Sequence, residues 1–194
     1  DSPTNTVATT QPVGNYAVLN PLDKGTNVVV ADGNLKNTAS TANWNGVRSS
    51  MAVSSGKWYF EVTVLANTFA TNGIELGIMQ STNVLTAANT ASFAGAGCWL
   101  YDNNNGSGSG RKANNGTVVN YGATFTTNDV IGCAFDVDAG SIEFYKNNVS
   151  QGVAYSSQTF GTVFPFLSVY STDSAAINFG QRPFAYTPPT GYKA

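Results

Sequence analysis

Apolar and polar residues alternate along this chain in short runs, a pattern that is typical of β-strands. In the stretch DVIGCAFDVDAGSIEFYKNN, residues 129–148, Ile131 and Phe135 fall on one face of an extended chain. The letters DAGS interrupt the run, and Ile142 and Phe144 then resume the same period of two. The pattern predicts two antiparallel strands joined by a short turn.

The two aspartates of this turn raise a calcium hypothesis, because Asp136 and Asp138 have the spacing that opens an EF-hand loop. Such a loop needs an oxygen ligand at its fifth position, Gly at its sixth and Glu at its twelfth. This chain has Gly140, Ser141 and Asn147 at those positions. We therefore favour the turn, in which Asp bonds its own backbone and Gly accepts a positive φ.

The same pattern along the rest of the chain predicts roughly nine or ten short strands and no amphipathic helix. Further strands are expected at 27–34, 56–65, 73–80, 97–102, 117–122, 163–170 and 175–180. We expect 82–96 to be a loop or one short helical turn. We expect 103–116, NNNGSGSGRKANNG, to be a Gly-Ser loop or a loose hairpin end.

Short strands separated by Gly and Asn turns predict an all-β fold, a sandwich of two antiparallel sheets. We expect one domain over 1–194, with an irregular N-terminal segment at 1–27 and an extended, Pro-rich tail at 181–194. The predicted core comprises Trp58, Phe60, Ile131, Phe135, Phe144, Leu167 and Phe179. A slip of one residue in register would turn all of these to the other face.

Composition narrows the classes of partner. Charged residues make up 10% of the chain and the net charge is −2, so there is no basic patch to attract nucleic acid or anionic lipid. No apolar run approaches the length of a membrane span.

The opening DSPTNT lacks Met and an apolar leader, which indicates a processed chain or an excerpt without a signal peptide. Cys98 and Cys133 lie in apolar strands, so we expect buried thiols rather than a disulfide.

The chain has no histidine, which excludes Ser-His-Asp and Cys-His catalysis and His-ligated zinc. It also lacks the GK[ST] of a phosphate-binding loop. A glycosidase needs two carboxylates, and Glu61, Glu75 and Glu143 are the only glutamates. We expect them on solvent-facing strand positions, either solvated or salt-bridged, which leaves a carboxylate-pair hydrolase as the minor alternative. We expect no enzyme, no cofactor and no metal.

The strands occur in a recognisable order, namely SSGKWYFEVTV, GIELGIM, NDVIGCAFDVDAGSIEFYKNN, FPFLSVY and AAINFGQRPF. This order, over about residues 45 to 186 and with Arg48 shortly before the first motif, resembles the SPRY domain. The resemblance implies a bent, concanavalin A-like sandwich. It also implies a non-catalytic module that binds a partner through loops at one rim. Asn147-Asn148 replaces the family's frequent Asn-Gly, and both pairs suit a turn. Contact residues vary within the family, so none is transferred here.

The flanking segments DSPTNT, GNYAVLNPLDKG and FAYTPPTGYKA resemble SPRY-type modules of tailed-bacteriophage and marine viral structural proteins. This resemblance implies a place on a virion surface, outside cells. The expected function is an adhesion domain of a tail fibre or spike that recognises a host-surface glycan or protein. The alternative is a structural subunit that packs against neighbouring virion subunits, with homo-oligomers formed through the parent assembly.

Binding residues favour loops on a rigid scaffold, so we place the contact surface around the Gly-Ser loop. The candidate contact residues are Trp44, Tyr101, Asn103, Asn104, Asn105, Arg111, Lys112 and Tyr121. Each has an alternative role. The loop could be a passive spacer, Trp44 could pack over the end of the sandwich, and the two tyrosines could form a core edge, because a tyrosine suits both places.

Overall fold

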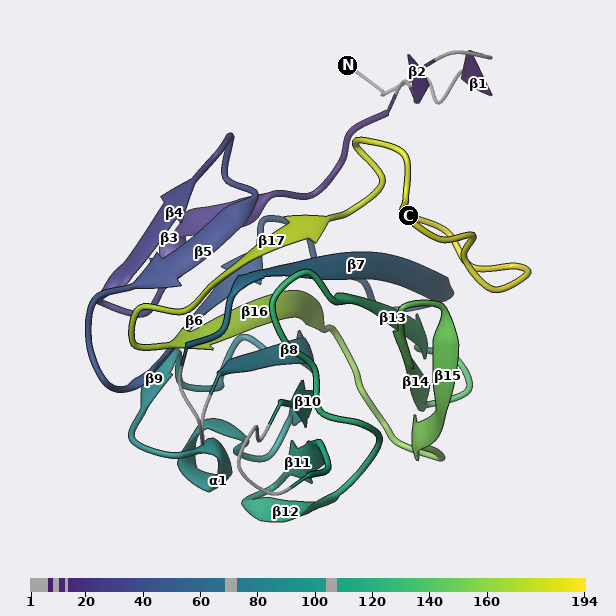
Figure 1. The fold of residues 1–194 in the computed structure, drawn as a ribbon. Coiled ribbons are helices and arrows are strands. Elements are labelled where there is room, and N and C mark those ends of the chain that lie inside the picture. The colour runs from purple at the N-terminus through teal and green to yellow at the C-terminus, as the bar shows by residue number, and fades with distance from the viewer. Residues whose placement is uncertain (1–6, 9–10, 13, 69–72, 104–107) are drawn as a thin grey trace.

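The structure is a computed structural model that describes residues 7–8, 11–12, 14–68, 73–103 and 108–194. Two antiparallel sheets packed face to face form its body (Figure 1). The eight-stranded sheet has the order β12-β11-β10-β8-β16-β6-β3, with β9 paired to β6. Its strands are β3 (Leu19–Lys24), β6 (Trp44–Ser49), β8 (Ile74–Met79), β9 (Thr86–Ala87), β10 (Cys98–Asp102), β11 (Arg111–Asn114), β12 (Thr117–Asn120) and β16 (Phe164–Tyr170).

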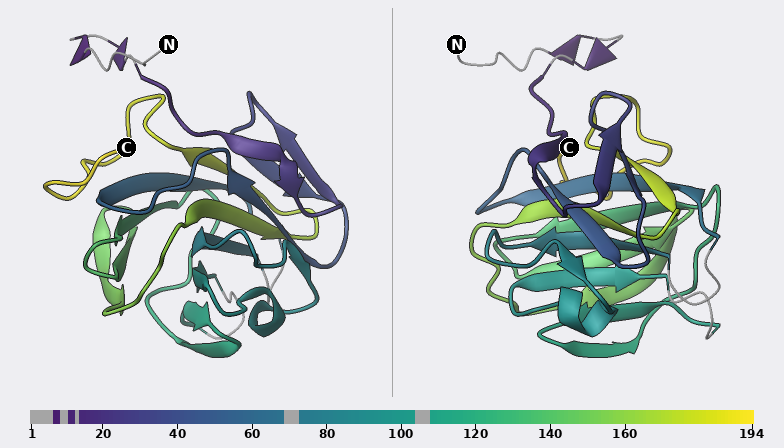
Figure 2. Two further views of the ribbon diagram at one scale, coloured as in Figure 1. Left: turned by 180° about the vertical axis from the view of Figure 1, so that it is seen from behind. Right: turned by 90° about the vertical axis from the view of Figure 1, so that its left-hand side faces the viewer.

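The seven-stranded sheet lies over the first and has the order β15-β14-β13-β7-β17-β5-β4. Its strands are β4 (Val28–Ala31), β5 (Lys36–Ala39), β7 (Lys57–Ala66), β13 (Val130–Asp136), β14 (Ser141–Lys146), β15 (Val149–Tyr155) and β17 (Ser174–Asn178). A separate pair, β1 (Val7–Ala8) and β2 (Gln11–Pro12), precedes them. Figure 2 shows the two layers from two further sides. The predicted all-β sandwich is confirmed.

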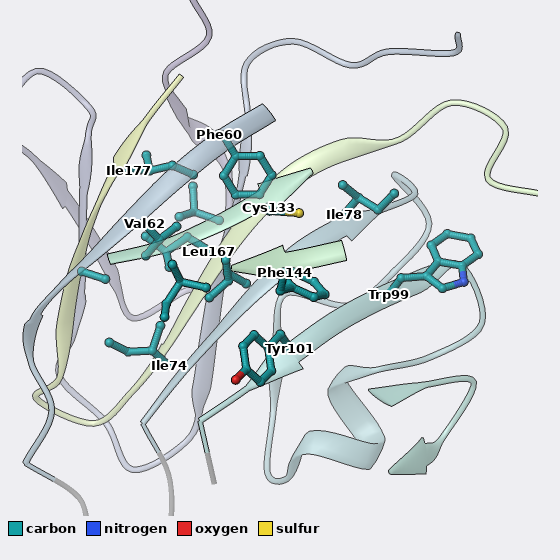
Figure 3. Packing of buried hydrophobic residues seen from close by; sticks show 14 of the residues in the cluster. Phe60, Val62, Ile74, Ile78, Trp99, Tyr101, Cys133, Phe144, Leu167 and Ile177 are labelled. Atoms are coloured by element: carbon teal, nitrogen blue, oxygen red, sulfur yellow. The ribbon is translucent and has the colours of Figure 1, made fainter. Parts of the chain in front are cut away.

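The main core fills the space between the sheets with side chains from alternate strand positions (Figure 3). Six of the predicted core residues are buried, namely Phe60, Ile131, Phe135, Phe144, Leu167 and Phe179. The predicted register is therefore confirmed. Trp58 differs, because it is only partly buried and packs at the edge of this core. Its indole N–H donates to the carbonyl of Ser55 at 2.7 Å.

Residues 129–148 form the predicted hairpin of β13 and β14. Asp136 caps the turn, since its Oδ1 accepts the backbone N–H groups of Asp138 and Ala139 at 3.0 Å each. Gly140 has a φ of +65°, and a Cβ at this position would lie 2.0 Å from the carbonyl oxygen of Gln158. The two cysteines are free and buried, as predicted.

Several strands lie where the sequence predicts none. β3 falls in the segment predicted as irregular, and β5, β6 and β15 are strands that the alternation did not reveal. β11 lies inside the predicted Gly-Ser loop and forms a hairpin with β12. Asn115 and Gly116, with φ of 49° and 73°, make its turn. Polar residues and glycine interrupt the apolar period in these strands, so the period is hard to see in the sequence.

A one-turn helix, α1 (Thr90–Phe93), covers the outer face of the eight-stranded sheet. Segment 82–96 was predicted as a loop or one helical turn, and it contains this turn. A second apolar cluster forms beneath it, including Trp44, Met79, Phe93, Leu100 and Phe166. In the described part of the chain, no helix has the length and apolarity needed to cross a bilayer.

The C-terminal tail covers the outer face of the seven-stranded sheet. The ring of Phe184 packs edge-on against Tyr59, with the ring centroids 5.0 Å apart. The carboxylate of Glu61 accepts the backbone N–H groups of Ala185 and Tyr186 at 2.8 and 3.0 Å. The prediction of a solvent-facing Glu61 is therefore wrong, because the tail encloses that face of β7.

Candidate functional site

Trp44, predicted as a candidate contact residue, begins β6 and is fully buried. Its ring packs edge-on against Tyr170 at 5.5 Å between centroids, in the cluster beneath α1. In the structure Trp44 is therefore packed within the fold, which is the alternative to a binding role.

The structure brings Tyr101 and Tyr121 together, with their rings edge-on and 5.2 Å apart. Tyr101 is fully buried, and its hydroxyl donates to the carbonyl of Ala123. Tyr121 is half-buried, and its hydroxyl donates to the carbonyl of Gly152 at 2.6 Å. These two side chains join β10 to the edge strand β15, and only Tyr121 keeps exposed surface.

Asn103 is buried directly after β10, and its Oδ1 accepts the backbone N–H of Phe125 at 2.7 Å. Its amide therefore fixes the chain path before β13. Asn104 and Asn105 lie outside the described residues.

Arg111 and Lys112 begin β11, and both point to partners within the domain. The Nε of Arg111 donates to Oδ2 of Asp102 at 2.8 Å, and its side chain is 25% exposed. The Nζ of Lys112 donates to a backbone carbonyl of β15. The same ammonium lies over the rings of Tyr121 and Tyr155, at 5.7 and 5.3 Å from their centroids.

A shallow hollow of about 280 Å³ lies beside Lys112, between the β11–β12 hairpin and β15. Its lining residues are Lys112, Asn114, Asn115, Thr117, Val119, Tyr155 and Gln158. We call this hollow the rim hollow. Of the predicted contact residues, only Lys112 lines it.

A row of polar side chains crosses the outer face of the eight-stranded sheet under α1. Glu75 stands directly opposite Asp102 on one side and Ser168 on the other. Glu75 and Asp102 are both fully buried. Burial raises the pKa of the Glu75 carboxyl well above its ordinary value, and the charge of Asp102 raises it further. The nearby Thr90 hydroxyl and the charge of Arg111 partly offset the shift. The prediction of a solvent-facing Glu75 is therefore wrong.

These two carboxyl groups do not form a hydrolytic site. Neither Glu75 nor Asp102 has solvent-accessible surface, whereas a glycosidase must hold its substrate between its carboxyl groups. The pair has a structural role, in which Asp102 positions Arg111 and Glu75 stays within the sheet.

The larger hollow is a pocket of about 510 Å³ at one open end of the sandwich. Its lining residues are Gly14, Asn15, Tyr16, Met51, Ala52, Val53, Trp58, Tyr59, Phe60, Phe135, Pro165, Phe179, Lys193 and Ala194. We call it the end pocket. Its volume falls within the usual range for ligand-binding pockets, about 300–1,000 Å³. The sequence pattern did not indicate this pocket, although the aromatic run KWYF supplies three of its residues.

Comparison with curated proteins gives relatives among RNA helicases. The chain is 28% identical, over 97% of its length, to the ATP-dependent RNA helicase DDX1 of Xenopus laevis. It is 30% identical, over 90% of its length, to the probable ATP-dependent RNA helicase ddx1 of Dictyostelium discoideum. The aligned parts are 24% and 21% of those proteins, so the chain spans about a quarter or less of their length.

These relatives contradict the viral assignment drawn from the flanking segments. These two relatives and the ATP-dependent RNA helicase Ddx1 of Drosophila melanogaster, which is 31% identical over 77% of this chain, are eukaryotic helicases and not virion proteins. The adhesion and virion-assembly functions are therefore wrong. The same holds for the host glycan, host protein and virion partners, and for the place on a virion surface. The flanks are short and rich in Thr, Asn and Pro, and such polar composition resembles many unrelated proteins.

Solved structures agree on the fold. The SPRY domain of human HERC1 aligns with a TM-score of 0.70 and 20% identity, covering 85% of this chain and 99% of that one. The TRIM65 PSpry domain aligns with a TM-score of 0.66 and 11% identity, covering 84% of this chain and 90% of that one. The SPRY domain family model matches residues 57–182. This chain therefore belongs to the SPRY domain family.

Proposed function

We propose that this chain is a non-catalytic protein-interaction module that serves a eukaryotic RNA helicase of the DDX1 type. Its membership of the SPRY family and its helicase relatives support this proposal. The fold offers binding surface on a rigid scaffold, and its buried carboxyl pair has no access to a substrate.

The observation that carries the proposal is the end pocket. Partly exposed Met51 and Trp58 line its mouth, while Phe60 and Phe179 lie buried at its floor. Aromatic residues are enriched among the residues that dominate protein interfaces. Methionine adapts its shape to varied partners. We therefore place the main contact surface at the end pocket.

The rim predicted from the sequence is the second candidate surface. Val119 is exposed there beside Lys112 and the half-buried Tyr121. Arg111 already pairs with Asp102, so we assign it to holding the rim rather than to contacting a partner.

A matched pair of variants tests which surface binds. Met51 at the end pocket and Val119 at the rim hollow are 43% and 44% exposed, so a change to Glu at either position disturbs the fold to a similar degree. A displayed library of random peptides is selected on the wild-type domain, and the enriched peptides are then measured against both variants.

We expect Met51→Glu to abolish binding of most enriched peptides and Val119→Glu to leave it unchanged. The reverse pattern would move the site to the rim hollow. Failure to enrich any peptide that depends on either position would contradict the proposed function. Circular dichroism and thermal melting confirm that both variants are folded.

A further inference from the structure

The end pocket opens into the main core rather than onto a flat face. The rings of Phe60, Phe135 and Phe179 meet there, with centroids 6.3 Å apart for Phe60 and Phe135 and 6.1 Å apart for Phe60 and Phe179. These rings belong to β7, to β13 and to the segment after β17. A floor of this kind accepts an apolar side chain, because burial of apolar surface is favourable and the floor has few polar groups to satisfy.

The wall of the pocket is fixed by the C-terminal tail. Lys193 forms a parallel bridge with Trp58 on the edge of the pocket. Its N–H donates to the carbonyl of Lys57 at 3.0 Å, and its carbonyl accepts the N–H of Tyr59 at 2.6 Å. The backbone of Lys193 is therefore held in place, while its side chain remains exposed.

In the described structure, the side chains that line the pocket carry a single charge, which is positive. Among the described lining residues, Lys193 is the only one with a charged side chain. Its Nζ lies 5.7 Å from the centre of the Trp58 ring and forms no ion pair with a described carboxylate. The neighbouring Lys57, in contrast, already pairs with Asp136 at 3.4 Å. Lys193 thus offers an ammonium group near an apolar pocket, and no described side-chain carboxylate pairs with it.

We infer that the end pocket recognises a peptide segment of a partner protein in which an apolar side chain lies next to a carboxylate. The apolar group enters the pocket against Phe60 and Phe179, and the carboxylate pairs with the ammonium of Lys193 over Trp58. This inference rests on the proposed function and names the partner chemistry of the same site. A basic residue beside the apolar group is disfavoured, because its charge would meet Lys193.

The peptides enriched on the wild-type domain test this chemistry directly. We expect Asp or Glu within two positions of the apolar residue that the pocket requires. One enriched peptide is then compared with a copy in which that acid is replaced by its amide. Trp58 lines the pocket, whereas Trp44 and Trp99 are buried, so tryptophan fluorescence reports binding and Trp58→Phe is the spectroscopic control.

A second test reverses the charge of Lys193 at the mouth of the end pocket and measures peptide binding. Lys193→Glu should weaken the acidic peptide on the order of tenfold, as expected for the loss of one exposed ion pair and its replacement by repulsion. The same variant should bind the amide copy about as well as the wild type does. Lys36→Glu on β5, outside the lining residues, is the matched control and should bind both peptides normally.

The outcomes separate the two proposals. Enriched peptides that need Met51 but show no acidic preference, and that bind Lys193→Glu unchanged, would overturn this inference and leave the proposed function intact. Peptides that bind Met51→Glu as well as the wild type would overturn the end pocket as the site, and the inference with it.

Discussion

The carboxyl group of Glu75 offers a direct test of how this fold is stabilised. It lies in β8 under Thr90 of α1, with Asp102 and Ser168 opposite it on the two neighbouring strands. Neither of its oxygens has a hydrogen-bond partner of normal geometry among the described residues. The substitution Glu75→Gln keeps the shape of the side chain and removes its ability to ionise. The new amide can donate a hydrogen bond toward the carboxylate of Asp102.

The sign of the effect follows from the raised pKa of Glu75. The folded protein retains a proton that the unfolded chain releases above its ordinary pKa of about 4.3. Wild-type stability therefore falls as pH rises from about 4.3 to the folded pKa, by about 1.4 kcal/mol per pH unit. Glu75→Gln has no carboxyl group to ionise at this position, so its stability does not fall in this way. The free energy of unfolding of the variant relative to the wild type should therefore rise by about 1.4 kcal/mol per pH unit from about pH 4.3 to the folded pKa of Glu75, and then level off.

Urea unfolding followed by far-ultraviolet circular dichroism, at unit steps from about pH 5 to about pH 8, measures this difference. Glu143→Gln, on the half-buried face of β14, controls for the loss of one acidic residue. A difference between Glu75→Gln and the wild type that stays constant with pH would refute the argument. A variant that becomes less stable as pH rises would refute it more strongly, because it would mean that Glu75 is ionised in the fold.

Three further substitutions test other parts of the structure. Glu61→Ala removes the acceptor of two tail amides, so we expect a loss of about 1–3 kcal/mol, with faster hydrogen exchange at those amides alone. Arg48→Met should cost about 3 kcal/mol in urea unfolding, because the buried guanidinium holds Asp23 and three carbonyls of the 80–83 turn. Gly140→Ala should lower stability by about 1–3 kcal/mol in a thermal melt, because its φ is +65° and the added Cβ would meet the Gln158 carbonyl. Unchanged stability in any of these variants would contradict the stated contact.

The inner faces of the sheets could be predicted from the sequence, because each is a continuous apolar surface. Alternation in β13 and β14 places Ile131, Phe135 and Phe144 inward, and all three are buried. Trp58 follows the same period but lies near the start of β7, where the end pocket begins. Period alone gives the direction of a side chain, and it does not show where the core ends.

The outer faces could not be predicted, because segments distant in sequence cover them. The prediction that Glu61 and Glu75 face solvent assumed that the face of a strand opposite the core is exposed to solvent. In the structure the C-terminal tail covers Glu61, and α1 covers Glu75. The α1 segment also covers Trp44, at the start of β6, and all six residues WNGVRS of β6 are buried despite their polar character. A covering segment leaves no periodic signal in the strand that it covers.

The charges of the domain also bear on where a partner binds. In the described structure, Arg48, Lys57, Arg111 and Lys146 each pair with a carboxylate of the same chain. The chain has nine lysine and arginine residues, so four of the nine are paired within the domain. One of these internally paired residues is Arg111 on the rim, for which the sequence predicted a contact with a partner. Lys193 instead lies over the ring of Trp58 at the mouth of the end pocket. An anionic group that approaches the end pocket gains an ion pair with Lys193 without breaking an internal contact of that ammonium, whereas at the rim it would compete with the Ala154 carbonyl for Lys112 and with Asp102 for Arg111. This difference in cost is the physical reason to look for the partner at the end pocket first.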